Sequence, residues 1–489
     1  MRKPVSITMD QRLFDVIYTH LFPGDHDEHG AVIAAGIVET ERGTRLLARE
    51  AFLARDGVEY VPGTRGYRAL TARFVAETSG YCESQNLCYL SVHCHGGRDT
   101  VEFSNDDLAS HERGYPALLD ITRGGPVGAL VFAENAVAGE VWTPSGRCRL
   151  DELVVLGNSI RRLYPGPRNG KVFTSSRYDR QSRLFGDVGQ TILNGLKVGI
   201  IGLGGGGSLI NQWLAHLGVG HIVALDFDRV DITNLPRIVG ATQWDARSLL
   251  TASRSQLLQR IGKRLATHKV KVASRVAKRA NPNIRYEAIV GDILDAETAA
   301  RLRDADFIFL ASDSIQSRLV FNALVQQYLI PGVQIGAKVP WDPRQKTITN
   351  VFAATRPVMP GPGHGCLECN DLIPPSKLRE ESLAPAERRR QRYMDDPEIT
   401  EPSVIALNVL SAGQALSDFM LMFTGLFEPE VELRYQLNFV RERHLCEVES
   451  RSKANCPDCS NTLNSRRARG DRARLPCRAE RKEEKSKAA

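Results

Sequence analysis

The sequence predicts an α/β protein of two domains, of which the second is built on a doubly wound parallel sheet. Three patterns support this prediction. Residues 198–226 read as a strand, a glycine-rich turn, a helix and a second strand. Residues 87–92 form an apolar, strand-like run that ends in His-Cys-His, and two CxxC pairs stand in the second half of the chain. The length of 489 residues is enough for two or three domains, each with its own core.

The composition and the distribution of apolar residues argue against a secreted or a membrane protein. The chain is 42% hydrophobic and 25% charged, which is ordinary for a soluble globular protein. The first residues lack the apolar segment of a signal peptide, and no apolar run approaches the roughly 20 residues that span a bilayer. We therefore expect a cytoplasmic protein without a membrane segment. In that compartment the ten cysteines favour metal sites over disulfides.

The positive charge is concentrated at the C-terminal end. The formal net charge is +7, and residues 466–489 hold ten basic and four acidic residues, a difference of +6. Residues 463–489 have few apolar side chains and no periodicity, so we expect a basic, disordered tail. Because the folded body is close to neutral, nucleic-acid binding is not the expected function.

The N-terminal domain is expected to span residues 1–150. Residues 5–22 suit a strand followed by an amphipathic helix, and Glu28 leads into a strand of small residues at 30–36. The other elements expected here are strands at 45–55, 58–62, 87–92, 128–134 and 138–143 and helices at 65–79 and 113–120. A turn-rich segment at 151–171 is expected to link this domain to the next.

His93 and His95 follow the strand at 87–92 and point to the same side of it, because alternate residues of a strand share a face. Asp107 follows twelve residues later and can return as a third zinc ligand. Three protein ligands leave the fourth position for a water, whose pKa zinc lowers to about 7. Glu28 is available as the general base. An isolated His-x-His pair is more often two surface histidines, but the acid at this spacing favours a metal site.

The order Glu, H-x-H and S-x-x-D resembles the JAMM (JAB/MPN) metalloprotease family. The resemblance implies a catalytic zinc bound by His93, His95 and Asp107. It further implies that Glu28 is the general acid and base, and that Ser104 helps to stabilise the oxyanion. The glycine after the second histidine departs from the family, which usually has proline there.

The second domain is expected at residues 172–462, beginning with a helix at 181–194 that leads into the glycine-rich turn. The turn contains Gly202, Gly204, Gly205 and Gly207, which let backbone N–H groups approach a phosphate at the start of the following helix. Asp226, at the end of the next strand, can hold a ribose hydroxyl. The pattern indicates a Rossmann-like nucleotide site, although NAD, FAD and ATP sites all use such a turn.

The motifs that flank the turn favour ATP over NAD and FAD. RYxRQ at 177–181, DFDxVxxxNLxR from 226, SDS at 312–314 and the two CxxC pairs occur in one order. This order resembles the MoeB/ThiF/HesA superfamily of ubiquitin-activating-like enzymes over roughly residues 172–460. The resemblance implies ATP-dependent adenylation of the C-terminal carboxylate of a ubiquitin-like or sulfur-carrier protein.

The resemblance also implies roles for single residues. Asp226 would bind the ribose, Asp313 would hold magnesium, and Arg180 would reach the ATP of the neighbouring subunit in a homodimer. Contacts to the phosphates are implied for Asn234, Arg237 and Lys269. Lys263 and Lys271 compete with Lys269 for that position.

A second metal site is expected at the CxxC pairs. Four thiolates in two tight turns suit a closed, tetrahedral and therefore structural zinc site. The ligands would be Cys366, Cys369, Cys456 and Cys459. Two unrelated turns would give the same spacing, but the resemblance to the superfamily favours zinc. Residues 370–400, where ubiquitin-activating relatives carry an acyl-accepting cysteine, contain no cysteine, so we expect no thioester from this segment.

These patterns predict a bifunctional enzyme of a ubiquitin-like-protein pathway, an adenylyltransferase fused to a zinc peptidase or isopeptidase. One alternative is an adenylyltransferase that acts on a small peptide in sulfur or natural-product biosynthesis. An NAD-dependent oxidoreductase would leave Arg180, Asn234 and Arg237 unexplained. A non-catalytic adaptor that binds ubiquitin-like proteins would have no need of Glu28 and Asp313.

Overall fold

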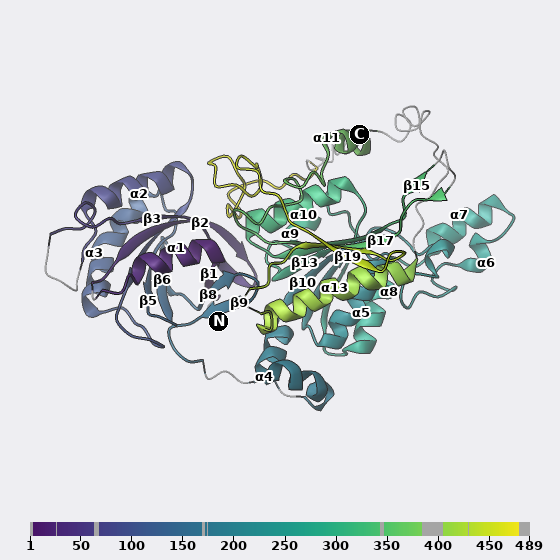
Figure 1. Cartoon of the computed structure of the whole chain (residues 1–489), viewed down its shortest axis with the longest axis horizontal. Coiled ribbons are helices and arrows are strands. Elements are labelled where there is room, and N and C mark those ends of the chain that lie inside the picture. Colours follow the sequence, from purple (N-terminus) through teal and green to yellow (C-terminus); the bar gives the residue numbers. More distant parts are fainter. Residues whose placement is uncertain are drawn as a thin grey trace, which may run out of the picture.

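The computed structural model shows two α/β domains that lie side by side (Figure 1). The N-terminal domain, purple to blue, lies to the left of a larger domain that runs from teal to yellow. Each domain contains a mixed β-sheet with helices on both faces, as expected for the α/β class. The residues that the structure describes are 3–25, 27–62, 68–168, 172–173, 175–342, 347–383, 404–428 and 430–478.

The N-terminal sheet has nine strands in the order β7-β6-β5-β4-β2-β3-β1-β8-β9. Its strands are β1 (Val5–Asp10), β2 (Gly30–Thr40), β3 (Gly43–Leu53), β4 (Cys88–Cys94), β5 (Val127–Phe132), β6 (Val137–Thr143), β7 (Gly146–Arg149), β8 (Glu152–Leu156) and β9 (Ile160–Leu163). The pairs β1–β3, β1–β8 and β4–β5 are parallel. Helix α1 (Gln11–Leu21) covers one face, and α2 (Ala72–Ser84) and α3 (Asn105–Ile121) cover the other.

The alternation of side chains along β4 determines where its histidines lie. The even-numbered residues of β4 pack in the core under α1, and Tyr89 packs in the core under α2 and α3. His93 therefore lies on the α3 face, because it is an even number of residues after Tyr89. Helix α3 begins at the same edge with a capping box, in which Ser104 and Asp107 each accept a hydrogen bond from the other's backbone N–H. The local sequence thus brings Asp107 to the end of β4.

The first domain extends beyond its predicted end. Residues 152–163, predicted as part of a linker, form β8 and β9, and β8 pairs in parallel with β1. Leu153 and Val155 are fully buried in the α1 core, which explains why this segment belongs to the sheet. The predicted strand at 58–62 is wrong, since the segment is mostly turn and contributes only an isolated bridge from Tyr60 to Leu70.

The second domain is organised around β10 (Lys197–Ile201), the strand that precedes the glycine-rich turn. Its sheet has the order β12-β11-β10-β13-β14-β17-β18-β19. The first five strands in this order, β12, β11, β10, β13 and β14, are mutually parallel. The other strands are β11 (His221–Leu225), β12 (Arg285–Ile289), β13 (Phe307–Leu310), β14 (Gly332–Lys338), β17 (Phe352–Val358), β18 (Tyr435–Phe439) and β19 (His444–Val448), with a separate hairpin of β15 (Trp341–Asp342) and β16 (Thr347–Ile348). The chain order reverses at β10, as the predicted Rossmann-like fold requires.

Helices cover both faces of this sheet, which confirms the doubly wound arrangement. Helices α4 (Asp179–Gly195), α5 (Gly205–Leu217), α8 (Lys269–Ala280) and α13 (Ile405–Thr424) pack on one face, and α9 (Ala296–Ala300) and α10 (Ile315–Tyr328) on the other. The other helices in the described part of this domain are α6 (Ser248–Thr251), α7 (Gln256–Leu265), α11 (Pro375–Ser382) and the short 3₁₀ turns η1 (Ser176–Tyr178) and η2 (Ile232–Asn234). Val38, Leu47 and Leu156 of the first domain share the α10 core, so the two domains meet through apolar contacts.

The prediction that the chain is disordered from residue 463 is wrong for residues 463–478, which the structure describes. Residues 463–478 are packed at the junction of the two domains, where Figure 1 shows the yellow chain. Ala468 is fully buried, and Gly470 forms a bridge with Ile37 of β2. The charge of this segment predicted disorder, but Arg467 is buried and hydrogen-bonded instead of solvated. Residues 479–489 of the predicted tail lie outside the described residues.

Helix α13 is long and apolar enough, by length and composition, to cross a membrane. The sequence predicts no segment of this length and composition, because no uninterrupted apolar run in it approaches roughly 20 residues. The helix instead contributes Ala412, Ala415 and Phe419 to the core of the second domain. It lies against α5 and the strands β14 and β17. A core helix passes the same length and composition test, so the helix is weak evidence for a membrane segment.

Candidate functional site

A cavity of about 740 Å³ lies at the carboxyl ends of β10, β11 and β13. Ligands of open α/β sheets bind at this edge, where the strand order reverses. Its lining includes Gly202, Gly204, Gly205, Gly206, Asp226, Asp228, Arg237, Lys269, Ser312, Asp313, Glu381, Asn408, Ser411 and Arg478. The cavity thus combines the glycine-rich turn with both acidic and basic side chains.

The four predicted glycines are not equivalent. Gly202 has a φ of +89°, which favours glycine, and it lines the cavity together with Gly204 and Gly205. Gly207 does not line the cavity. A Cβ atom on Gly207 would lie 1.9 Å from the carbonyl oxygen of Gly202, so this glycine lets α5 pack closely against the turn. Gly206 takes the place in the lining that was predicted for Gly207.

Asp226 fixes the turn that surrounds the cavity. Its carboxylate accepts hydrogen bonds from the backbone N–H groups of Leu203 (2.7 Å) and Asp228 (2.8 Å). Burial raises the pKa of Asp226, and the ammonium of Lys269, 3.9 Å away, acts in the opposite direction. Lys269 also lies 2.6 Å from a carboxylate oxygen of Asp228. The two acids therefore hold the lysine at the cavity, where it can face a phosphate.

Other residues predicted for nucleotide binding are divided between the cavity and positions outside it. Arg237, Lys269 and Asp313 line the cavity, whereas the competing lysines at 263 and 271 do not. The amide oxygen of Asn234 accepts a hydrogen bond from the backbone of Asp231 (3.2 Å), in the turn η2, and Asn234 is absent from the lining. Arg180 is exposed on α4 and is also absent from the lining.

Several lining residues were not predicted from the sequence, and among them are three from segments after residue 370. Glu381 of α11 accepts hydrogen bonds from the backbone N–H groups of Ile315 (2.8 Å) and Gln316 (2.9 Å) at the start of α10. Arg478 forms an ion pair with Asp292 (3.2 Å). Asn408 of α13 lines the cavity, and its amide nitrogen is buried and has no hydrogen-bond partner among the described residues. All three come from segments far along the chain from the glycine-rich turn, and no local pattern marks them.

The residues predicted for the first zinc site meet at the end of β4. The Nε2 atoms of His93 and His95 are 3.2 Å apart, and they lie 3.5 Å and 3.3 Å from Asp107 Oδ2. The carboxylate of Glu28 lies 3.7 Å from His95 Nε2. Because three ligand atoms lie within 4.8 Å of one another, the histidines and Asp107 fit a single metal ion.

The surroundings of this cluster orient its members. Burial raises the pKa of Asp107, but hydrogen bonds with His93, His95 and Ser104 outweigh it and hold the pKa well below its usual range. A carboxylate in that state can bind a metal over the whole physiological pH range. The Ser104 hydroxyl donates to Asp107 (2.8 Å), which makes Ser104 a residue that positions Asp107 in this structure. Burial raises the pKa of Glu28, as suits a residue that takes up a proton.

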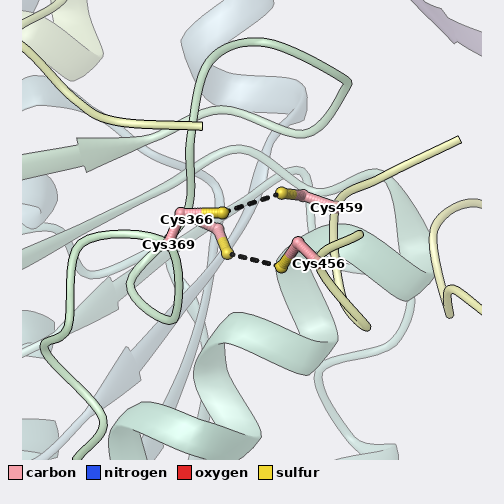
Figure 2. A group of neighbouring side chains, drawn as sticks. All are labelled: Cys366, Cys369, Cys456 and Cys459. Atoms are coloured by element: carbon pink, nitrogen blue, oxygen red, sulfur yellow. Dashed lines mark hydrogen bonds between the residues drawn. The ribbon is translucent and has the colours of Figure 1, made fainter. Parts of the chain in front are cut away.

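The four cysteines of the CxxC pairs form a second cluster (Figure 2). Cys366 and Cys456 have sulfur atoms 3.6 Å apart, and the sulfur atoms of Cys369 and Cys459 are 3.5 Å apart. Zinc–sulfur bonds of 2.3 Å in a tetrahedron separate the sulfurs by about 3.8 Å, so the donor set fits zinc. All four cysteines are buried, and this leaves no open position for water.

Comparison with known protein families identifies the second domain. The model of the ThiF family matches residues 178–457. Molybdopterin-synthase adenylyltransferase of Escherichia coli is 33% identical over 149 residues, which are 30% of this chain and 52% of that protein. Sulfur carrier protein adenylyltransferase of Thermus thermophilus is 30% identical over 148 residues, 30% of this chain and 48% of that protein. The chain thus spans about half the length of the curated relatives that it matches.

Among solved structures, E. coli MccB has 19% sequence identity and a TM-score of 0.44, over 60% of this chain and 74% of that one. The microcin C7 biosynthetic enzyme MccB in complex with N-formylated MccA has 16% identity and a TM-score of 0.45, over 88% of this chain and 100% of that one. The family match covers more than half of the residues and includes the glycine-rich turn, Asp226, Arg237, Lys269 and Asp313. This chain is a member of the ThiF family.

Proposed function

We propose that the second domain uses ATP to adenylate the C-terminal carboxylate of a ubiquitin-like or sulfur-carrier protein, and that the first domain is a zinc peptidase or isopeptidase. The observation that carries the first activity is the cavity in which the glycine-rich turn, Arg237, Lys269 and Asp313 converge. Peptidase activity is supported by the cluster of Glu28 with the three predicted zinc ligands. A cytoplasmic location is part of this proposal.

Adenylation requires the protein to offset negative charge. A carboxylate oxygen of the substrate attacks the α-phosphorus of ATP, a new P–O bond forms, and the bond to the β-phosphate oxygen breaks to release pyrophosphate. The cations Arg237 and Lys269 and the N–H groups at the start of α5 lower the repulsion between the carboxylate and the triphosphate. Asp313 would hold magnesium, which supplies further positive charge to the leaving pyrophosphate.

The nature of the relatives supports a protein C-terminus as the substrate. Two of the relatives are named molybdopterin-synthase adenylyltransferase and sulfur carrier protein adenylyltransferase, and each name gives a protein as what is adenylated. A small peptide with a free carboxylate is the alternative substrate, since the same groups would adenylate it. An NAD-dependent reaction is less well supported, because it would leave the positive side chain of Arg237 without a role, whereas adenylation uses it to offset the charge of the triphosphate.

A homodimer is also part of the proposal. Arg180 lies at the exposed start of α4 and outside the lining of the cavity of its own chain. In the proposed dimer Arg180 enters the cavity of the neighbouring subunit and adds a positive charge beside ATP. No cysteine lies in residues 370–400, so the adenylate is the expected final product of this domain and no thioester forms there. Most of that segment lies outside the described residues.

In the proposed peptidase, His93, His95 and Asp107 would hold zinc, which would supply an acidified water and polarise the scissile carbonyl. Glu28 takes the proton of the attacking water and delivers it to the leaving amine. Its position beside His95, outside the set of three ligands, suits this exchange. A protease that exposes the terminal glycine of a ubiquitin-like protein would prepare the carboxylate that the second domain adenylates.

The test of the adenylation proposal is exchange of labelled pyrophosphate into ATP in the presence of a small protein that ends in Gly-Gly. The wild-type chain should catalyse exchange, and Asp313→Ala should abolish it, while Lys263→Ala, outside the cavity, should retain it. Arg180→Ala should also lose exchange, and mixing it with Asp313→Ala should restore part of the activity through one intact composite site. Absence of exchange with protein and peptide carboxylates alike would overturn the proposal.

A further inference from the structure

We propose that Asn408, on α13, donates a hydrogen bond to a phosphoryl oxygen of the nucleotide bound at the start of α5. This inference rests on the proposed function, because it assigns a further residue to the same nucleotide site. It adds to that site a donor from a helix about 200 positions beyond the glycine-rich turn in the sequence.

The first observation is an amide nitrogen without a partner. Asn408 is 8% exposed, and its Nδ2 atom is buried and makes no hydrogen bond with any described residue. A buried donor that stays unpaired costs about 1–3 kcal/mol, so such groups are rare in folded proteins. The residue lines the nucleotide cavity.

The second observation is the position of this nitrogen against the glycine-rich turn. A Cβ atom on Gly205 would lie 2.1 Å from Asn408 Nδ2, so the amide touches the backbone of the first residue of α5. Any larger residue at position 205 would push the amide away. The absence of a side chain at Gly205 thus makes room for Asn408, in addition to giving a phosphate access to the backbone.

The third observation concerns the start of α5 itself. The N-cap residue Gly204 provides no side-chain hydrogen bond, so the first N–H groups of this 13-residue helix are available to an anion. Asn408 Nδ2 lies beside these N–H groups, and Arg237 lines the same side of the cavity near Gly205. Donors from α5 and α13 therefore meet at Gly205, and the Cβ atom of Arg237 lies beside them. A phosphoryl group, which carries several acceptor oxygens, satisfies all of them together.

The experiment compares Asn408→Asp and Asn408→Ala with the wild-type chain in equilibrium titrations with ATP, AMP and adenosine in the presence of magnesium. The aspartate variant keeps the shape of the side chain but replaces the donor by a negative oxygen. It should weaken ATP binding by roughly tenfold or more, and Asn408→Ala by a smaller factor. Adenosine has no phosphate, so its affinity should change by less than about twofold. Ser417→Ala, on the exposed side of α13, is the matched control and should bind ATP as the wild type does.

Thermal unfolding adds a readout that a merely structural asparagine would not give. Without nucleotide, Asn408→Ala should unfold at the same temperature as the wild type or higher, because it removes an unpaired donor. The increase in unfolding temperature on adding ATP should be smaller in this variant. Variants that bind ATP like the wild type would overturn the inference and leave the proposed function intact. Equal losses for ATP and adenosine would also overturn it, whereas a wild-type chain that binds no ATP would overturn the proposed function as well.

Discussion

The guanidinium of Arg467 lies 3.5 Å from the carboxylate of Asp10, and this ion pair joins the C-terminal segment to the first domain. The two side chains are 4% and 1% exposed. Asp10 also caps α1 by accepting a hydrogen bond from the backbone of Leu13. Arg467 donates further hydrogen bonds to the carbonyl oxygen of Arg49 and to Asn461. Arg467 thus fixes the C-terminal segment against the first domain.

Arg467→Ala should destabilise the chain strongly. The substitution leaves the buried Asp10 carboxylate without its cation, and breaking one partner of a buried pair costs about 3–5 kcal/mol. Calorimetry should show a lower unfolding temperature, with the first domain affected most. Arg474→Ala, on an exposed side chain of the same segment, is the control and should shift the temperature little. Equal effects of the two substitutions would mean that the ion pair does not hold the segment.

Local motifs explain why much of the site is predictable from the sequence. The glycine-rich turn, the His-x-His pair and the CxxC pairs each place chemically related residues within a few positions, so their geometry follows from one strand end or one turn. Asp107 is also predictable, because the capping box of α3 starts at the edge where β4 ends. The predicted doubly wound sheet follows from the same alternation of strands and helices.

The failures share a physical cause, which is that packing between distant segments leaves no periodic trace. Asn408 and Glu381 reach the cavity only because α13 and α11 return to the carboxyl edge of the sheet. Arg467 looks like one charge among many in a polar segment, and only the fold provides Asp10 as its partner. Gly207 follows the glycine pattern, yet its role in the structure is to let α5 approach Gly202.

Asp418, on α13, should make stability depend on pH. Burial raises the pKa of this carboxyl group to about 6, although Gln414 donates a hydrogen bond to it. The folded state therefore binds the proton more tightly than the unfolded state, whose aspartate has an ordinary pKa of 3.8. Stability contributed by the protonated group is present below pH 4 and is lost as the pH rises to about 6. Above that pH the loss amounts to about 3 kcal/mol.

Asp418→Asn should remove this dependence, because the amide stays neutral and keeps an oxygen for Gln414. The variant should unfold at a higher temperature than the wild type at pH 8, and the difference should shrink as the pH falls toward 4. Asp120→Asn, an exposed position on α3, serves as the control and should leave the pH profile unchanged. A gain in stability of the same size at both pH values would show that the gain does not come from this titration.

The purified chain should contain about two zinc ions, since the two clusters have separate donor sets. Elemental analysis should find one ion fewer in His93→Ala and one fewer in Cys369→Ala, whereas Cys148→Ser, outside both clusters, should retain both. A chelator should first remove the ion of the histidine site, because its histidine side chains are 19% and 18% exposed. The cysteine site is fully buried and should release its ion only as the domain unfolds. One zinc ion or none in the wild-type chain would contradict at least one of these sites.

Glu28→Gln should abolish cleavage of a ubiquitin-like fusion protein without removing zinc. The carboxylate lies 3.7 Å from His95 Nε2 but is not one of the three grouped ligands, so a neutral amide should leave the metal in place and lose only the transfer of the proton. The loss should be at least about 100-fold in kcat, the usual contribution of a general base. Glu112→Gln, an exposed position on α3, should cleave like the wild type. Cleavage that persists in the Glu28 variant with zinc bound would assign the base to another residue, while loss of zinc from that variant would make Glu28 a ligand.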